Sequence, residues 1–189
     1  MITTTIFLSS LASLIFNENF YQNEHVKNNV YDSLPDANER THEIVMFLDK
    51  GTELGSKFNQ KEKLHMQDVK NLVDNGFLLY YFCIILLISV IIYYVYTKKK
   101  FNHVLIYSGG IIIGFCLVSF LLQAQFQYFF IKFHELFFDN NLWLLNPATD
   151  KLIILLPEQF FVDFVKNVYA RSFMAGVGLF FVGFVRKKI

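Results

Sequence analysis

Two histidines with carboxylates close by are the side chains of this sequence best suited to acid–base chemistry. One lies in Glu62-Lys63-Leu64-His65-Met66-Gln67-Asp68 and the other in Phe133-His134-Glu135. An imidazole can accept or donate a proton near neutral pH. The sequence has no Gly-x-Ser-x-Gly elbow, no His-Glu-x-x-His zinc motif and no phosphate-binding glycine loop, so any chemistry must rest on histidines and carboxylates.

If the segment around His65 is a helix, its imidazole lies on an apolar face. At about 100° per residue, His65 shares an arc with Val69 and Leu72, whereas Lys70 lies on the opposite side. Asp68 follows three residues later and is close enough on a helix to orient the imidazole. The alternative is a buried structural histidine satisfied by a neighbouring carboxylate, and the spacing by itself favours this alternative.

The segment around His134 is predicted to be a helix with one strongly aromatic face. His134 lies at the margin of this face, and Glu135 lies toward the polar side. Packing at a membrane interface explains the aromatic residues more simply than a groove for an acyl chain does. The face is formed by Phe126, Phe129, Phe130, Phe133 and Phe137.

The elements that carry these residues are predicted to be membrane helices. The composition, 54% hydrophobic and 17% charged, is too apolar for a soluble domain of this size. The uncharged segment 76–96 is long enough to cross a hydrocarbon core of about 30 Å. We therefore predict an all-α, polytopic membrane protein with about four transmembrane helices plus extracytoplasmic helices, forming a single domain over 1–189. The predicted spans are 2–16, 76–96, 104–126 and 169–185.

The segment 2–16 could also be the core of a signal peptide. No basic residue precedes it and no small-x-small cleavage site follows, so we expect a retained helix. By the positive-inside bias, the clusters 98–100 and 186–188 face the cytoplasm. This orientation places the loops 17–75 and 127–168, with all the candidate residues, on the extracytoplasmic side of the cytoplasmic membrane.

The remaining predictions concern two helices, a glycine pair and the net charge. Asp36 is expected to cap a helix that ends at Gly51, and a second helix is expected to run from Gln60 into the second span. Gly110 and Gly114 form a Gly-x-x-x-Gly pair, which we interpret as helix packing. The formal net charge of +1 provides no basic surface for nucleic acid, so we expect no nucleic-acid partner.

Taken together, these motifs resemble the lipoprotein intramolecular transacylase family of bacterial membrane proteins. Their order, their spacing and the four-span layout match over roughly 58–161, although Lys61 stands where the family motif has arginine. The matching residues are Glu62-x-x-His65-Met66-x-Asp68, Phe133-His134-Glu135-Leu136-Phe137-Phe138, Trp143-Leu144-Leu145-x-Pro147-x-Thr149-Asp150 and Pro157-Glu158-x-Phe160-Phe161.

The resemblance implies a reaction at the outer face of the membrane. Such enzymes move the sn-2 acyl chain of a diacylglyceryl-modified lipoprotein to the α-amine of its N-terminal cysteine, which leaves a lyso-form lipoprotein. The partners implied are this substrate and membrane lipid, and no cofactor is expected. The sequence does not reveal the oligomeric state.

The family's two functional histidines correspond to His65 and His134. We expect His65, oriented by Asp68, to be the base and His134 to be the acid or electrophilic partner, and the reverse assignment is also open. The residues expected to contact the substrate are Glu62, Glu135, Trp143 and Asp150.

Two other functions use the same residues. In a metal-dependent membrane hydrolase, His65 and His134 would coordinate zinc together with carboxylates from Asp68, Glu135 or Asp150. In a non-catalytic membrane protein, the outer loops would bind a partner.

Overall fold

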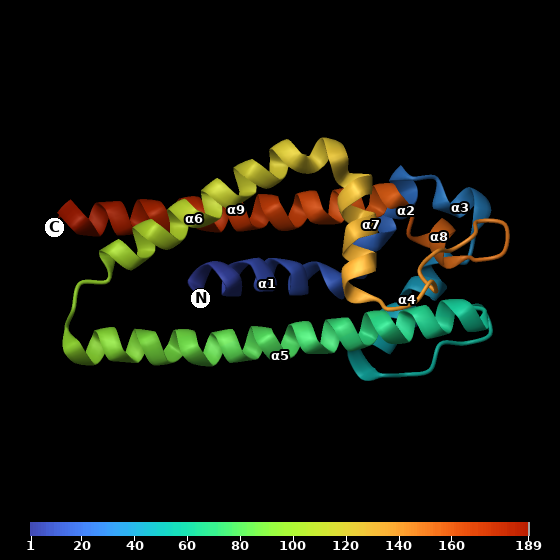
Figure 1. The fold of residues 1–189 in the computed structure, drawn as a ribbon, viewed down its shortest axis with the longest axis horizontal. Helices are drawn as coiled ribbons and strands as arrows, with labels where there is room; N and C mark the ends of the chain where they lie inside the picture. The colour runs from blue at the N-terminus through green and yellow to red at the C-terminus, as the bar shows by residue number, and fades with distance from the viewer. Residues whose placement is uncertain (189) are drawn as a thin grey trace. The chain divides into compact units, whose positions relative to one another are not determined.

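The computed structural model describes residues 1–188, and its regular secondary structure in this range consists of helices without strands, as the all-α prediction requires (Figure 1). Ile189, the last residue of the predicted domain, lies outside the described residues. The α-helices are α1 (Ile2–Ile15), α2 (Glu18–Lys27), α3 (Val30–Ser33), α4 (Ala37–Lys50), α5 (Gln60–Thr97), α6 (Asn102–Leu122), α7 (Phe126–Phe137), α8 (Leu152–Leu155) and α9 (Glu158–Lys188). A 3₁₀ turn, η1 (Gln123–Gln125), joins α6 to α7.

Three helical stretches in the described chain are long and apolar enough to cross a membrane: Gln60–Thr97, Asn102–Phe137 and Glu158–Lys187. Their apolar side chains are widely exposed, with Leu121 at 76%. Such a surface is stable against lipid and not against water. Helix α1 is apolar but has 14 residues, about 21 Å of helix, so the predicted fourth span stays a prediction.

The helices group into two compact units. Unit 1 comprises residues 1–12, 76–124 and 165–189, and it contains the apolar stretches of α5, α6 and α9. Unit 2 comprises residues 13–75 and 125–164, and it contains α2, α3, α4, α7 and α8 together with the first turns of α5 and α9. Both candidate histidines therefore belong to unit 2.

Glycines allow α6 and α9 to pack closely in unit 1. A Cβ on Gly109 would lie 2.6 Å from the carbonyl oxygen of Gly176, so only glycine fits there. Gly110 and Gly114, in contrast, would meet nothing within 4 Å. The prediction of close packing at the Gly-x-x-x-Gly pair was therefore wrong. The glycine of α6 that faces α9 is Gly109, one residue earlier.

Unit 2 has a core of aromatic and aliphatic side chains. Tyr21, Val45 and Phe160 are buried at its centre, and the hydroxyl of Tyr21 donates a 2.8 Å hydrogen bond to the carbonyl of Ile15. This bond satisfies the one polar atom that Tyr21 brings into the core. Partly buried side chains that pack around the core are Phe16, Phe20, Leu156, Phe161 and Phe164.

The two helices predicted in the first loop are present. Helix α4 ends at Gly51 in the left-handed conformation, with φ of 71°, as expected for a glycine stop. Asp36 precedes α4, but its side chain makes no capping hydrogen bond and instead pairs with Arg40 at 2.9 Å. Helix α5 begins at Gln60 and continues into the apolar stretch, as predicted.

We predict that Gly109→Ala destabilises the protein by about 1–3 kcal/mol, because the added methyl group collides with backbone. Gly110→Ala is the matched control. It should leave stability unchanged or raise it by up to about 1 kcal/mol, since alanine favours helix. Thermal unfolding of the detergent-purified protein, followed by circular dichroism, measures both. Equal losses in the two variants would contradict the observed α6–α9 packing.

Candidate active site

His65 and His134 come from different helices and face each other in unit 2. His65 lies in the second turn of α5 and His134 near the end of α7, and their ring centroids are 6.2 Å apart. Both side chains are buried, at 7% and 9% exposure. Phe138 packs against both rings, at 5.4 Å from His65 and 5.6 Å from His134. Two imidazoles distant in sequence thus share one apolar environment.

A backbone carbonyl fixes the protonation pattern of His134. Its Nδ1 lies 2.7 Å from the carbonyl oxygen of Phe130, which can only accept a hydrogen bond. Nδ1 must therefore carry a proton, and in the neutral ring the lone pair is on Nε2. The ring is also held between Phe130, at 4.4 Å, and Trp143, at 4.8 Å.

His65 has no comparable anchor. Its Nδ1 is buried and has no hydrogen-bond partner within the described chain. A buried acceptor without a partner is tolerated better than a buried N–H, so the proton of neutral His65 belongs on Nε2. His65 then presents an N–H donor, whereas His134 presents a lone pair.

Burial keeps both imidazoles neutral. Desolvation, with smaller contributions from the neighbouring His134 and Lys61, lowers the pKa of His65 to about 4, although the charge of Asp68 opposes the shift. Desolvation also lowers the pKa of His134, against the opposing effect of its bond to Phe130. At pH 7 the pair therefore carries no charge and contains one donor and one acceptor for a substrate.

Asp68 does not orient the His65 imidazole through a hydrogen bond. Its Oδ2 accepts instead from Nδ2 of Asn140, at 2.9 Å, and so ties the loop that follows α7 to helix α5. Its charge still favours protonation of His65. The expected role as an orienting carboxylate is thus replaced by an electrostatic effect and a loop contact.

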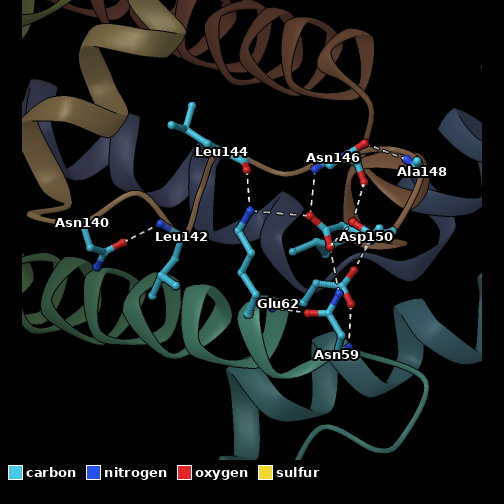
Figure 2. Close-up of polar contacts among 11 residues, drawn as sticks. Asn59, Glu62, Asn140, Leu142, Leu144, Asn146, Ala148 and Asp150 are labelled. Carbon is cyan, nitrogen blue, oxygen red and sulfur yellow. Dashed lines mark hydrogen bonds and ion pairs between the residues drawn. The ribbon is translucent and has the colours of Figure 1, made fainter.

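Glu62 is buried at 1% exposure and binds backbone amides. Its Oε2 accepts from the amide of Asn59 at 2.7 Å, and Oδ1 of Asn59 accepts from the amide of Glu62 at 3.0 Å, which forms a capping box at the start of α5. Its Oε1 accepts from the amide of Leu152, the first residue of α8, at 2.6 Å. Figure 2 shows Glu62 and Asn59 joined in this way. These contacts make Glu62 a structural residue.

Asp150 belongs to the same hydrogen-bond network as Glu62, because both bind Asn59. It accepts hydrogen bonds from Nδ2 of Asn59 at 2.8 Å and from the amide of Asn146 at 2.7 Å (Figure 2). The hydrogen bonds from the amide of Asn146 and from the side chain of Asn59 lower the pKa of Asp150, so the carboxylate stays ionised. Lys61 lies 3.7 Å from Asp150 and donates a 2.6 Å hydrogen bond to the carbonyl of Leu144. The loop between α7 and α8 is therefore fastened to the start of α5.

The other two residues predicted to contact the substrate are Trp143 and Glu135. Trp143 packs against His134, with 31° between the ring planes. Glu135 points to the exposed side of α7 and bonds Lys132 at 2.6 Å. Trp143 thus lies beside the histidine pair, and Glu135 is paired on the polar face.

Sequence reasoning missed three residues that shape the site. Asn59 stands three positions before Glu62, which is the spacing of a capping box, so this signal was available. Phe138 is the last residue of the motif around His134, but neither it nor Asn140 gave any sign of a contact with α5, because these contacts arise only in the folded chain. Among the residues that the structure describes, no group of three or more His, Cys, Asp or Glu side chains is arranged to hold a metal ion.

Comparisons with known proteins agree in pointing to one family. The family model described as lipoprotein intramolecular transacylase Lit matches residues 1–161. The solved structure of the membrane-integral lipoprotein intramolecular transacylase from Bacillus cereus matches with a TM-score of 0.87 and 21% identity, over 99% of this chain and 92% of that one. No curated protein matches the sequence.

Two structures of the same Bacillus cereus protein with a single histidine replaced also match. The match to the arginine variant has a TM-score of 0.80 and covers 88% of the variant's chain. The match to the alanine variant has a TM-score of 0.81 and covers 90% of the variant's chain. Both are 20% identical and cover 99% of this chain. At such identities the structural likeness establishes the fold.

We predict that Glu62→Ala destabilises the protein by about 1–3 kcal/mol, because two buried amides lose their acceptor. Glu62→Gln should also destabilise it, since an amide group offers one acceptor oxygen in place of two. Chemical unfolding in detergent measures the loss, and Glu53→Ala, at an exposed position before α5, is the control. A Glu62→Ala protein of parental stability that has lost activity would instead indicate a role in substrate binding.

Proposed function

The chain belongs to the lipoprotein intramolecular transacylase family, and we propose that His65 and His134 together catalyse its acyl transfer on lipoproteins. The proposed substrate is a lipoprotein whose N-terminal cysteine carries a diacylglyceryl thioether and a free α-amine. The sn-2 acyl chain moves from glycerol to this amine. The observation that carries the assignment is the pair of buried, neutral imidazoles with ring centroids 6.2 Å apart.

We assign the role of general base to His134, the reverse of the order expected from sequence. Its bond to Phe130 directs the lone pair to Nε2, so it can accept the proton that the amine loses on attacking the ester. The imidazolium that forms is stabilised by Phe130 and Trp143, because a cation within about 6 Å of an aromatic ring is attracted to its face.

His65 is assigned as the electrophilic partner. Its neutral Nε2–H donates a hydrogen bond to the oxygen that becomes negative in the tetrahedral intermediate, as neutral imidazoles do in other enzymes. The intermediate collapses when the bond between the acyl carbon and the glycerol oxygen breaks. The proton held by His134 then passes to this oxygen, so an amide and a free hydroxyl result and both histidines return to their starting state.

No covalent enzyme intermediate is required. The amine and the ester belong to one molecule, so their proximity is supplied by the substrate. Asp68 and Trp143 contribute by charge and by stacking, whereas Glu62 and Asp150 hold the loops in place. Contact of the substrate with Glu135 is proposed at the exposed side of α7.

We also propose that the site faces the extracytoplasmic side of the cytoplasmic membrane. The support is the distribution of lysine and arginine, because the basic clusters 98–100 and 186–188 favour a cytoplasmic location for their ends of the spans. Unit 2, which contains both histidines, then lies on the outer side.

We predict that His65→Ala and His134→Ala each reduce turnover by about 10²- to 10⁴-fold, since each removes one proton-transferring or oxyanion-stabilising group. The assay is expression in a bacterium that lacks lipoprotein N-acylation, followed by mass spectrometry of lipoprotein N-termini. His42→Ala is the matched control, because His42 also lies in unit 2 but is exposed and paired with Glu18. Parental conversion to the lyso form by both active-site variants would refute the assignment.

We predict that one ionisation governs the acid side of the pH profile. The pKa of His65 is about 4 and that of His134 is lowered from its ordinary value by desolvation, so we expect neither ring to govern the rate between pH 6 and 8. The substrate α-amine, with a pKa of roughly 7.7 to 8.0, still has to lose a proton. The initial rate should therefore rise about tenfold per pH unit from 6 to 7.5 and level off above 8.

Initial rates of the purified enzyme on a synthetic diacylglyceryl lipopeptide, measured from pH 5 to 9, test this expectation. A histidine with an ordinary pKa of about 6.5 would add a second ionisation and steepen the slope toward two below pH 6. Such a steeper limb, or a plateau that begins near pH 6.5, would contradict the desolvated histidine pair.

A further inference from the structure

The charges of the chain separate by structural unit. All 16 Asp and Glu residues lie in the segments 13–75 and 125–164, which form unit 2. Unit 1 has no side-chain carboxylate, although it contains a large share of the basic residues. These are Lys98, Lys99, Lys100, Lys166, Arg171, Arg186, Lys187 and Lys188. The anions that balance them cannot be acidic side chains of unit 1 itself.

Four of these cations line a groove of about 660 Å³ within unit 1. The groove lies at the link between α5 and α6, where Lys98 adopts a left-handed φ of 51°. The chain reverses direction at this link (Figure 1). Arg186 enters from α9, which Asn102 fastens to the start of α6 by a 3.1 Å hydrogen bond to the carbonyl of Arg186. The cations in the lining are Lys98, Lys99, Lys100 and Arg186.

None of the ion pairs formed within residues 1–188 involves a cation of this groove. Lys99 is held in place by the hydroxyl of Tyr93, at 2.8 Å, and lies 5.2 Å from the centre of its ring. Asn102, the first residue of α6, follows Phe101, which provides no side-chain cap. The groove thus combines several unneutralised cations with an uncapped helix start, an arrangement that attracts an anion.

The remaining lining is apolar and aromatic. Ile91 and Val95 come from the last turns of α5, and Tyr94 packs edge-on against Phe101 at 4.9 Å. A free phosphate would leave this part of the groove without a partner. A molecule with both an anionic head and a hydrocarbon tail would satisfy both parts.

We propose that this groove binds one anionic glycerophospholipid, with the phosphate among Lys98, Lys100 and Arg186 and an acyl chain along Ile91 and Val95. Charge complementarity identifies the headgroup class, and the continuity of the groove with the apolar surface of α5 identifies a lipid as its source. The site is separate from the histidine pair, which belongs to unit 2. It neither requires nor tests the acyl-transfer reaction.

Native mass spectrometry of the full chain, released from nanodiscs of mixed phosphatidylglycerol and phosphatidylcholine, tests this proposal. The wild-type protein should retain phosphatidylglycerol in preference to phosphatidylcholine. Each cation near an anionic lipid surface contributes about fivefold to affinity. The affinity for phosphatidylglycerol should therefore fall roughly 100-fold in the triple variant Lys98→Gln, Lys100→Gln, Arg186→Gln. Lys187→Gln removes a charge from the same end of α9 without lining the groove, and should retain the preference.

Four outcomes would overturn the lipid site. One is retention of both lipids alike by the wild-type protein, and a second is an equal loss in Lys187→Gln and in Arg186→Gln alone, which would indicate general surface attraction. A third is displacement of the lipid by millimolar inorganic phosphate, which would indicate a plain phosphate site. If the triple variant does not fold, titration of the wild-type complex with salt decides, because a preference that does not weaken between 0.05 and 0.5 M salt is not electrostatic.

Discussion

The buried carboxylate of Glu62 is the interaction on which the site depends. It binds the amides of Asn59 and Leu152, which are far apart in the chain, and the second bond joins residues separated by 90 positions. One side chain therefore fixes where α5 starts and where the loop after α7 ends. His65 lies one turn beyond Glu62, and Trp143 lies in the fastened loop, so the relation between the two histidines follows from this anchor. Asp150 strengthens it through Asn59.

Burial determines what the two imidazoles can do. Phe138 lies against both rings and Trp143 against one, and this apolar contact lowers the pKa of each histidine. A protonated pair would repel itself at this separation, whereas a neutral pair provides one donor and one acceptor. The proposed roles rest on the different surroundings of the two Nδ1 atoms, because that of His134 lies beside a carbonyl whereas that of His65 has no partner within the described chain. Backbone geometry, more than a neighbouring carboxylate, sets the tautomers.

The sequence predicted the features that depend on local pattern. Helices α4 and α5 begin and end near the expected residues because glycine conformation and apolar periodicity are local properties. Their partners were not predictable in the same way. Gly109 and not Gly110 faces α9, since the rotation of a lipid-exposed helix is fixed by its neighbours and leaves little trace in an almost uniformly apolar sequence.

The partners of the carboxylates were also not predictable from the sequence. Glu62, Asp68 and Asp150 were expected at the site because of their motif, with Asp68 orienting His65 and the other two contacting the substrate. In the structure, Glu62 and Asp150 bind backbone amides and Asp68 binds Asn140. Spacing along a helix indicates which face a carboxylate occupies, but its partner can come from a loop many residues away. Only the folded chain distinguishes a carboxylate that acts on substrate from one that holds a loop.

An intramolecular reaction also explains why so apolar a site suffices. The substrate brings its own nucleophile and its own ester, so the protein has to move one proton and stabilise one oxyanion. In the proposed mechanism water is the competing nucleophile, and the burial that lowers the histidine pKa values also leaves little of either ring exposed to it. A weakly basic imidazole remains adequate, because an amine that has added to a carbonyl is a far stronger acid than the free ammonium. In this mechanism desolvation therefore favours transfer of the acyl group to the amine over its loss to water.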